Sequence, residues 1–133
     1  NVRSNIGVQI GEKELIASPS SSLTTKVTFT SDIKDIFSNF VQDCRERDVQ
    51  LVASWPNTFA NPVYFGNATV DANIKIIREF WNSMEVEVVG NYKDSMLGSE
   101  FFFDTVYHLN AEGVRLRTEK LISQLKPYLE KGS

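Results

Sequence analysis

The chain has 133 residues, of which 41% are hydrophobic and 23% charged, and its 14 Lys and Arg stand against 17 Asp and Glu for a net charge of -3. This length is typical of one domain, and this composition is typical of a globular protein, so a single domain over 1-133 is expected. The slight acidity leaves no broad basic surface for phosphates, which argues against a nucleic-acid partner. With one Cys and one His, neither a metal site nor another cofactor is expected. No apolar run reaches the roughly 18 to 20 residues of a membrane span.

The first 30 residues have weak periodicity. Val8 and Ile10 alternate with Gly and Gln, and Val27 and Phe29 alternate again after the polar tract ASPSSSLTT. These patterns predict short strands or extended pieces around a loop, an irregular lead-in over 1-30.

A helix is predicted from Ser31. Thr30 or Ser31 can cap it, and Asp32 suits its first turn. Its apolar residues recur at helical spacing along one face: Ile33, Ile36, Phe37, Phe40, Val41 and Cys44. On this face Cys44 is expected to be a buried small hydrophobic residue rather than a reactive thiol.

Two short strands with a helix between them are predicted next. VQLVAS at 49-54 and VEVVG at 86-90 are short runs rich in β-branched residues, typical of strands in a parallel sheet. The loop WPNTFANP and an amphipathic helix that Thr69 is expected to cap lie between them. A crossover of this kind predicts parallel strands, with ligand sites beyond their carboxyl ends.

The last part combines a long loop with a final helix. The loop carries Asp104 and His108, and the helix is expected from about Ala111 to Lys126, where Pro127 would end it. Its inward residues are expected to be Val114, Leu121, Ile122 and Leu125. The predicted fold is α/β, a three-layer α/β/α unit with a short parallel sheet whose core covers 31-130.

His108 is the candidate general base, because imidazole can take and give a proton near neutral pH. Asp104, four residues earlier, could hold its tautomer, as in a triad of nucleophile, His and acid. Spacing alone leaves a second interpretation open, in which His108 only caps the final helix or forms hydrogen bonds within the loop.

The segment FFFDTVYHLNAEGVRLRTEKLISQL resembles the final block of the SGNH (GDSL-like) hydrolase and acyltransferase superfamily. The frequent family phrase His-Leu-Asn-x-x-Gly corresponds here to His108, Leu109, Asn110 and Gly113, and VQLVASWP is similar to an earlier strand and loop of the same family. The resemblance implies a flavodoxin-like fold with His108 as catalytic base and Asp104 as its acid. The family usually has Asp-x-x-His, whereas this chain has Asp-x-x-x-His.

The family's nucleophilic Ser, in a Gly-Asp-Ser motif, and its oxyanion-hole motifs have no counterpart in this chain. The resemblance therefore implies the C-terminal portion of a larger domain, which agrees with a start at Asn1. It implies an ester hydrolase or O-acyltransferase that acts on an acylated small molecule or carbohydrate. The members that it resembles most are bacterial envelope proteins related to the D-alanyl transfer protein and to polysaccharide O-acetyl esterases. A location outside the cytoplasm is therefore expected. The chain alone would be inactive, and it would need the missing N-terminal half or self-associate.

Two further interpretations stay open. Trp55 and Asn57 follow the first strand and are candidate substrate-binding residues, although aromatic packing in the loop explains Trp55 as well. The chain could also be a non-catalytic carbohydrate-binding, protein-binding or assembly domain of this fold, or a doubly wound domain in which YHLN is a coincidence.

Overall fold

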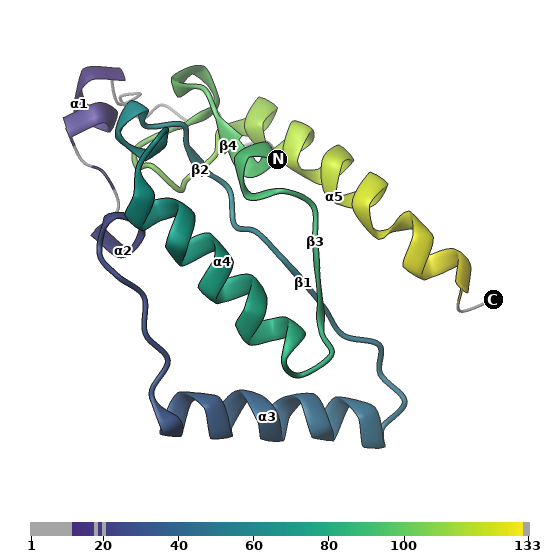
Figure 1. Cartoon of the computed structure of the whole chain (residues 1–133). Helices are drawn as coiled ribbons and strands as arrows, with labels where there is room; N and C mark the ends of the chain where they lie inside the picture. Colours follow the sequence, from purple (N-terminus) through teal and green to yellow (C-terminus); the bar gives the residue numbers. More distant parts are fainter. Residues whose placement is uncertain (1–11, 18, 20, 132–133) are drawn as a thin grey trace.

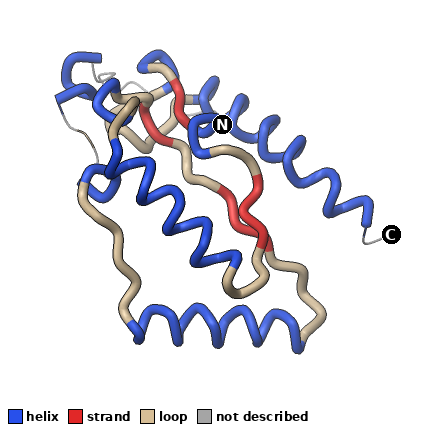
Figure 2. The backbone as a smooth tube through the Cα atoms, in the orientation of Figure 1, coloured by secondary structure: helices blue, strands red, loops and turns tan. Residues whose placement is uncertain are grey.

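The computed structural model describes residues 12-17, 19 and 21-131. This part is mixed α/β and mostly helical, with two small parallel sheets of two strands each (Figures 1 and 2). The elements in chain order are α1 (Glu12–Ala17), α2 (Ser21–Thr24), α3 (Ser31–Glu46), β1 (Val52–Ser54), β2 (Thr58–Phe59), η1 (Pro62–Tyr64), α4 (Ala68–Asn82), β3 (Glu87–Val89), η2 (Tyr92–Ser95), β4 (Met96–Leu97), η3 (Ser99–Phe101) and α5 (Ala111–Lys131), where η marks a 3-10 helix.

The two strands predicted from the β-branched runs form the first sheet. β1 and β3 pair in parallel, with Val52 opposite Glu87 and Ser54 opposite Val89. Helix α4 connects them and packs on β3, and α5 runs on the other side of the strands in the view of Figure 1. The predicted parallel pairing is therefore confirmed.

The second sheet lies in segments that were expected to be loops. β2 and β4 also pair in parallel, with Thr58 opposite Met96 and Phe59 opposite Leu97. Thr58 and Phe59 are buried, so tertiary burial stabilises strands that are too short to have a recognisable period. The loop interpretation of these residues was wrong.

The lead-in is partly helical, which corrects the expectation of extended pieces. α1 buries Leu15 completely, in one cluster with Phe59 and Phe102. After α2, the Asn73 side chain donates to the carbonyls of Leu23 and Thr25, both at 2.9 Å. These contacts come from residues far away in sequence, so local alternation could not reveal them. Val8 and Ile10 lie outside the described residues.

Helix α3 begins where it was predicted, and the Thr30 hydroxyl accepts a hydrogen bond from the Ile33 amide at 3.4 Å. Its apolar face is mostly not buried, since Ile36 is 65% and Phe40 51% exposed, and Cys44 is only half-buried. The helix lies across the end of α4 (Figure 1) and touches it through one edge, where Phe37 meets the rings of Phe80 and Trp81. Val41 is the buried residue of this face, and the expected burial of Cys44 is only partly correct.

Two predicted helix ends were also wrong. Asn67, not Thr69, caps α4, because its side-chain oxygen accepts hydrogen bonds from the amides of Thr69 and Val70. Helix α5 continues through Pro127 to Lys131. Proline removes one helical hydrogen bond, but the helix goes on beyond it beside β3, where Glu87 raises the pKa of the Tyr128 hydroxyl.

The inward face expected for α5 is only partly correct. Leu121 and Leu125 are half-buried, whereas Val114 and Ile122 are exposed. Helix α5 runs beside a sheet that has only two strands (Figure 1), so only a narrow stripe of the helix is buried.

The core consists of two clusters. The larger lies between the β1–β3 sheet and α4, and its buried members are Trp55, Tyr64, Val70, Val88 and Tyr92. The smaller cluster joins Leu15, Phe59 and Phe102 beneath the loop that carries His108. This loop therefore rests on a core of its own.

Candidate active site

The loop around His108 is a closed turn. The amide of Phe103 donates to the carbonyl of His108 at 2.9 Å, the amide of Asn110 donates to that of Phe101 at 2.8 Å, and Phe102 and Leu109 form an antiparallel bridge. Phe102 is completely buried, so the middle phenylalanine of the FFF run anchors the turn.

Two longer-range hydrogen bonds fix this turn against the second sheet. The Phe59 amide donates to the Val106 carbonyl at 3.0 Å, and the Asn57 side chain donates to the Tyr107 carbonyl at 2.8 Å. Strand β2 and the loop after β1 therefore determine where His108 stands.

Asp104 and His108 meet across the tip of the turn. The carboxylate Oδ1 lies 2.7 Å from Nδ1 of the imidazole, and the Thr105 hydroxyl accepts from the His108 amide at 3.1 Å. The turn brings the two side chains together across the three residues that separate them. An ionised carboxylate only accepts hydrogen bonds, so this contact favours the tautomer with the proton on Nδ1, in which Nε2 is the acceptor. The side chains are open to solvent, with His108 66% and Asp104 48% exposed.

A complete catalytic triad is not assembled by the described residues, since none of their hydroxyl groups is hydrogen-bonded to the His108 ring. Nor does any group of three His, Cys, Asp or Glu side chains among them form a potential metal site. None of the helices in this part of the chain is long and apolar enough to cross a membrane.

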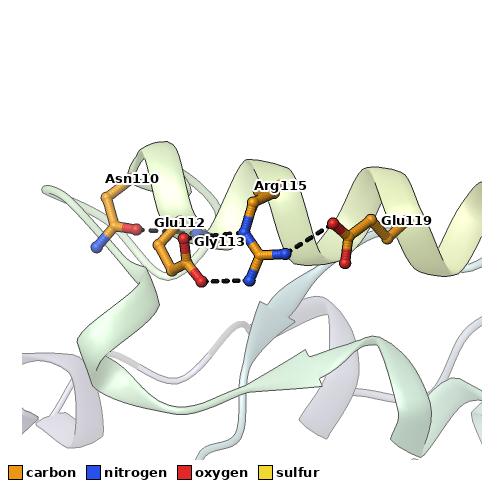
Figure 3. A network of polar contacts seen from close by, with 5 residues as sticks. All are labelled: Asn110, Glu112, Gly113, Arg115 and Glu119. Atoms are coloured by element: carbon orange, nitrogen blue, oxygen red, sulfur yellow. Dashed lines mark hydrogen bonds and ion pairs between the residues drawn. The ribbon is translucent and has the colours of Figure 1, made fainter.

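The residues after His108 organise the start of α5 (Figure 3). Asn110 accepts from the Gly113 amide at 3.0 Å and donates to the Glu100 carbonyl at 2.6 Å. A Cβ atom at Gly113 would lie 2.6 Å from the Phe101 carbonyl oxygen. The cap and the close approach together account for the Asn and the Gly of the phrase His-Leu-Asn-x-x-Gly.

Figure 3 also shows a chain of charges along the first turns of α5. Arg115 bonds to both Glu112 and Glu119, the latter at 2.7 Å. Its hydrogen bond lowers the pKa of the Glu112 carboxyl, and the two carboxylates in turn raise the pKa of Arg115. All three side chains are exposed, so this is a solvated helix face that contributes little to stability.

Of the two candidate substrate-binding residues, Asn57 clamps the His108 loop, as described above, and Trp55 is buried. The Trp55 ring contacts that of Tyr92 edge to face, with centroids 5.2 Å apart, and the Arg78 guanidinium lies 5.5 Å from its centroid. Packing of the aromatic ring therefore accounts for much of the burial of Trp55.

A cavity of about 300 Å³ lies beside these residues. Trp55, Thr58, Tyr92 and Tyr107 line it together with apolar side chains of α4 and of the lead-in. The sequence reasoning missed Thr58, Tyr92 and Tyr107, although Trp55 and Tyr92 lie shortly beyond the carboxyl ends of β1 and β3. The rule that ligands bind at strand ends, which had pointed to Trp55 after β1, could also have pointed to Tyr92 after β3.

Comparison with known proteins gave no match for this chain among protein-family models, curated proteins or solved structures. The function is therefore inferred from the chemistry of the residues described above.

Proposed function

We propose that this chain provides the catalytic histidine and its acid to a serine-dependent ester hydrolase or O-acyltransferase of the SGNH type. The observation that carries the proposal is the 2.7 Å contact between Asp104 and His108, on a solvent-exposed turn held by hydrogen bonds at both ends. The contact is itself a hydrogen bond within the loop, and the catalytic role adds to it that the exposed ring can offer Nε2 to a partner, which is what the experiment below tests.

In this proposal His108 Nε2 takes the proton of a serine hydroxyl while the serine oxygen attacks the ester carbonyl carbon. The imidazolium is stabilised by Asp104 and then returns the proton to the leaving alcohol, which leaves an acyl-enzyme. Water, or an acceptor hydroxyl in a transferase, repeats the two proton transfers and releases the acyl group. The serine would come from outside the present sequence, which has no Gly-Asp-Ser motif.

We infer a three-layer α/β/α unit of the flavodoxin-like SGNH type in which β1 and β3 are neighbouring strands of a larger sheet. The parallel pairing of these strands and the helices α4 and α5 beside them support this assignment. The missing strands, or a second copy of the chain, would then cover the free edges of the sheet.

The test compares hydrolysis of 4-nitrophenyl acetate by this chain and by a longer protein that contains this sequence and a Gly-Asp-Ser segment. We expect activity from the longer protein alone, and we expect His108→Ala to lower its kcat/KM by about 10³-fold or more, because a triad loses its base. Thr118→Ala, an exposed change on α5, is the control and should leave the rate unchanged.

A fluorophosphonate probe identifies the nucleophile, and it should label a serine outside these 133 residues. Full activity of the longer protein with His108→Ala would refute the catalytic role and favour a non-catalytic binding domain. Labelling of a serine within this chain, with turnover that depends on His108, would refute the divided site.

A further inference from the structure

The turn that carries Asp104 and His108 stands on a small core to which the start of the chain contributes. Leu15 of α1 and Phe102 of the turn are both 0% exposed and belong to this core together with Phe59 of β2. The partly buried side chains packed against them are Leu97, Phe101, Val106 and Leu109. Most of these lie in the segment 101-109, so the core to which Leu15 belongs is the one on which the turn rests.

The two limbs of the turn are held in different ways. The limb that leads to His108 receives two hydrogen bonds from outside the turn, on the carbonyls of Val106 and Tyr107 at 3.0 and 2.8 Å. The limb that leads to Asp104 has backbone hydrogen bonds, in the described part of the chain, only within the turn and to its close neighbours in sequence. The burial of Phe102 is therefore what ties this second limb to distant segments.

Asn61 holds α1 in place at this core. Its buried side-chain amide donates to the carbonyls of Leu15 and Ile16 at 3.4 and 3.0 Å, and its oxygen accepts from the Val63 amide at 3.0 Å. The two carbonyls belong to the last turn of α1, where helical carbonyls lack partners within the helix. A helix of six residues is not stable alone, so α1 depends on Asn61 and on the burial of Leu15 for its place.

We infer that α1 is a positioning element for the pair of Asp104 and His108. Leu15, held by Asn61, completes the core on which Phe102 places the limb that leads to Asp104. The 2.7 Å contact between the carboxylate and Nδ1 of the imidazole then depends on α1 remaining docked. Both residues act through Phe102, so they are positioning residues. A loss of catalysis on release of α1 rests on the proposed function, whereas the positioning itself does not.

The test uses Leu15→Ala in the chain as it is, with two readouts by NMR. Hydrogen exchange of the Phe103 amide, which donates to the His108 carbonyl, should accelerate by about tenfold or more, because the cavity left by the leucine lets the turn open locally. Amides in the interior of α4, such as that of Ile77, should accelerate much less. The ¹⁵N shifts of the His108 ring should show a smaller share of the Nδ1–H tautomer.

Leu23→Ala is the matched control, since Leu23 also belongs to the lead-in but packs against the larger cluster. It should leave the Phe103 amide and the tautomer unchanged. Leu15→Met conserves the volume of the side chain and should behave like the original chain. If Leu15→Ala does not fold, Leu15→Val decides, because it removes one methylene group and should shift both readouts in the same direction by less.

The inference is wrong if Leu15→Ala accelerates exchange at Phe103 and at Ile77 by the same factor, because Leu15 would then support the whole fold rather than the turn. It is equally wrong if the tautomer does not respond, or if the original chain already has the Nε2–H tautomer and thus no pair to position. Neither readout requires turnover. Full activity of a longer protein with His108→Ala would therefore refute the proposed catalysis and leave this inference standing.

Discussion

Asp104 and His108 show how a turn can join two side chains that lie four residues apart. The pairing depends on the hydrogen bonds of Phe103 and Thr105, which bring the two ends of the turn together. The sequence suggested the roles of acid and base but left their distance open, since an i, i+4 spacing in a loop does not define a geometry. The Asp104 carboxylate reaches Nδ1 of His108 only because the turn is closed.

The pair makes a prediction that requires no enzyme activity. When His108 is neutral, its proton should reside on Nδ1, because the Asp104 carboxylate accepts from that nitrogen at 2.7 Å. In Asp104→Ala the Nε2–H tautomer, which neutral histidine prefers in water, should become the major form. The ¹⁵N chemical shifts of the ring report the tautomer, and their assignment is immediate because the chain has a single histidine.

The control for this experiment is Asp94→Ala, which removes a carboxylate that does not bond to the histidine. It should leave the tautomer unchanged. An Nε2–H tautomer in the unmodified chain would mean that Asp104 does not orient His108, and the acid would have to be sought elsewhere.

Among the elements, α5 depends most on individual residues at its start. The Asn110 side chain caps it and ties it to Glu100, and Gly113 allows it to approach Phe101. A glycine in the first turns of a helix normally costs stability, since alanine is the better helix former by about 1 kcal/mol. Here the close approach to a backbone carbonyl outweighs that preference.

Gly113→Ala should therefore destabilise the protein rather than stabilise it. The new Cβ would lie 2.6 Å from the Phe101 carbonyl oxygen, and that carbonyl is held by the Asn110 amide at 2.8 Å, so it cannot move away freely. We expect the free energy of unfolding to fall by about 1 to 2 kcal/mol, as for an overpacked site. Urea denaturation followed by circular dichroism measures it.

Ser123→Ala is the matched control, because it introduces the same residue at an exposed position of the same helix. It should leave stability unchanged or raise it slightly. Equal or greater stability of Gly113→Ala would show that the start of α5 can shift away from Phe101, and the close packing of this loop would not be a constraint.

The described part of the molecule leaves apolar side chains exposed and sheet edges without a partner strand. Ile36 and Phe40 of α3 are more than half exposed, and the β1–β3 sheet has only two strands, so each has an outer edge. Surfaces of this kind favour association with another chain. This agrees with the proposal that the missing part of the domain or a second copy covers them.

We therefore expect self-association that increases with concentration. Ile36→Glu should weaken it by roughly tenfold, the effect of losing one well-buried aliphatic side chain from an interface. Asn39→Glu places the same charge at an exposed polar position of α3 and should have a much smaller effect. Sedimentation equilibrium measures both, and a chain that stays monomeric at every concentration without binding a hydrophobic dye would contradict the expectation.

The sequence by itself determined the elements whose signals are local. The helical spacing from Ile33 to Cys44, the Thr30 cap and the β-branched runs of β1 and β3 predicted elements that the structure contains. The crossover helix between the runs was enough to predict parallel pairing. The candidate pair of Asp104 and His108 was also visible, because unusual residue types stand out in a sequence.

Only the tertiary structure decided what depends on distant partners. Leu15 became part of a helix by packing on Phe59 and Phe102, and α5 continued past Pro127, where Tyr128 meets β3. The cavity unites Trp55, Thr58 and Tyr92 from the loop after β1, from β2 and from η2. A local sequence pattern cannot predict contacts between distant segments, because burial and hydrogen bonding depend on the whole fold rather than on neighbours in the chain.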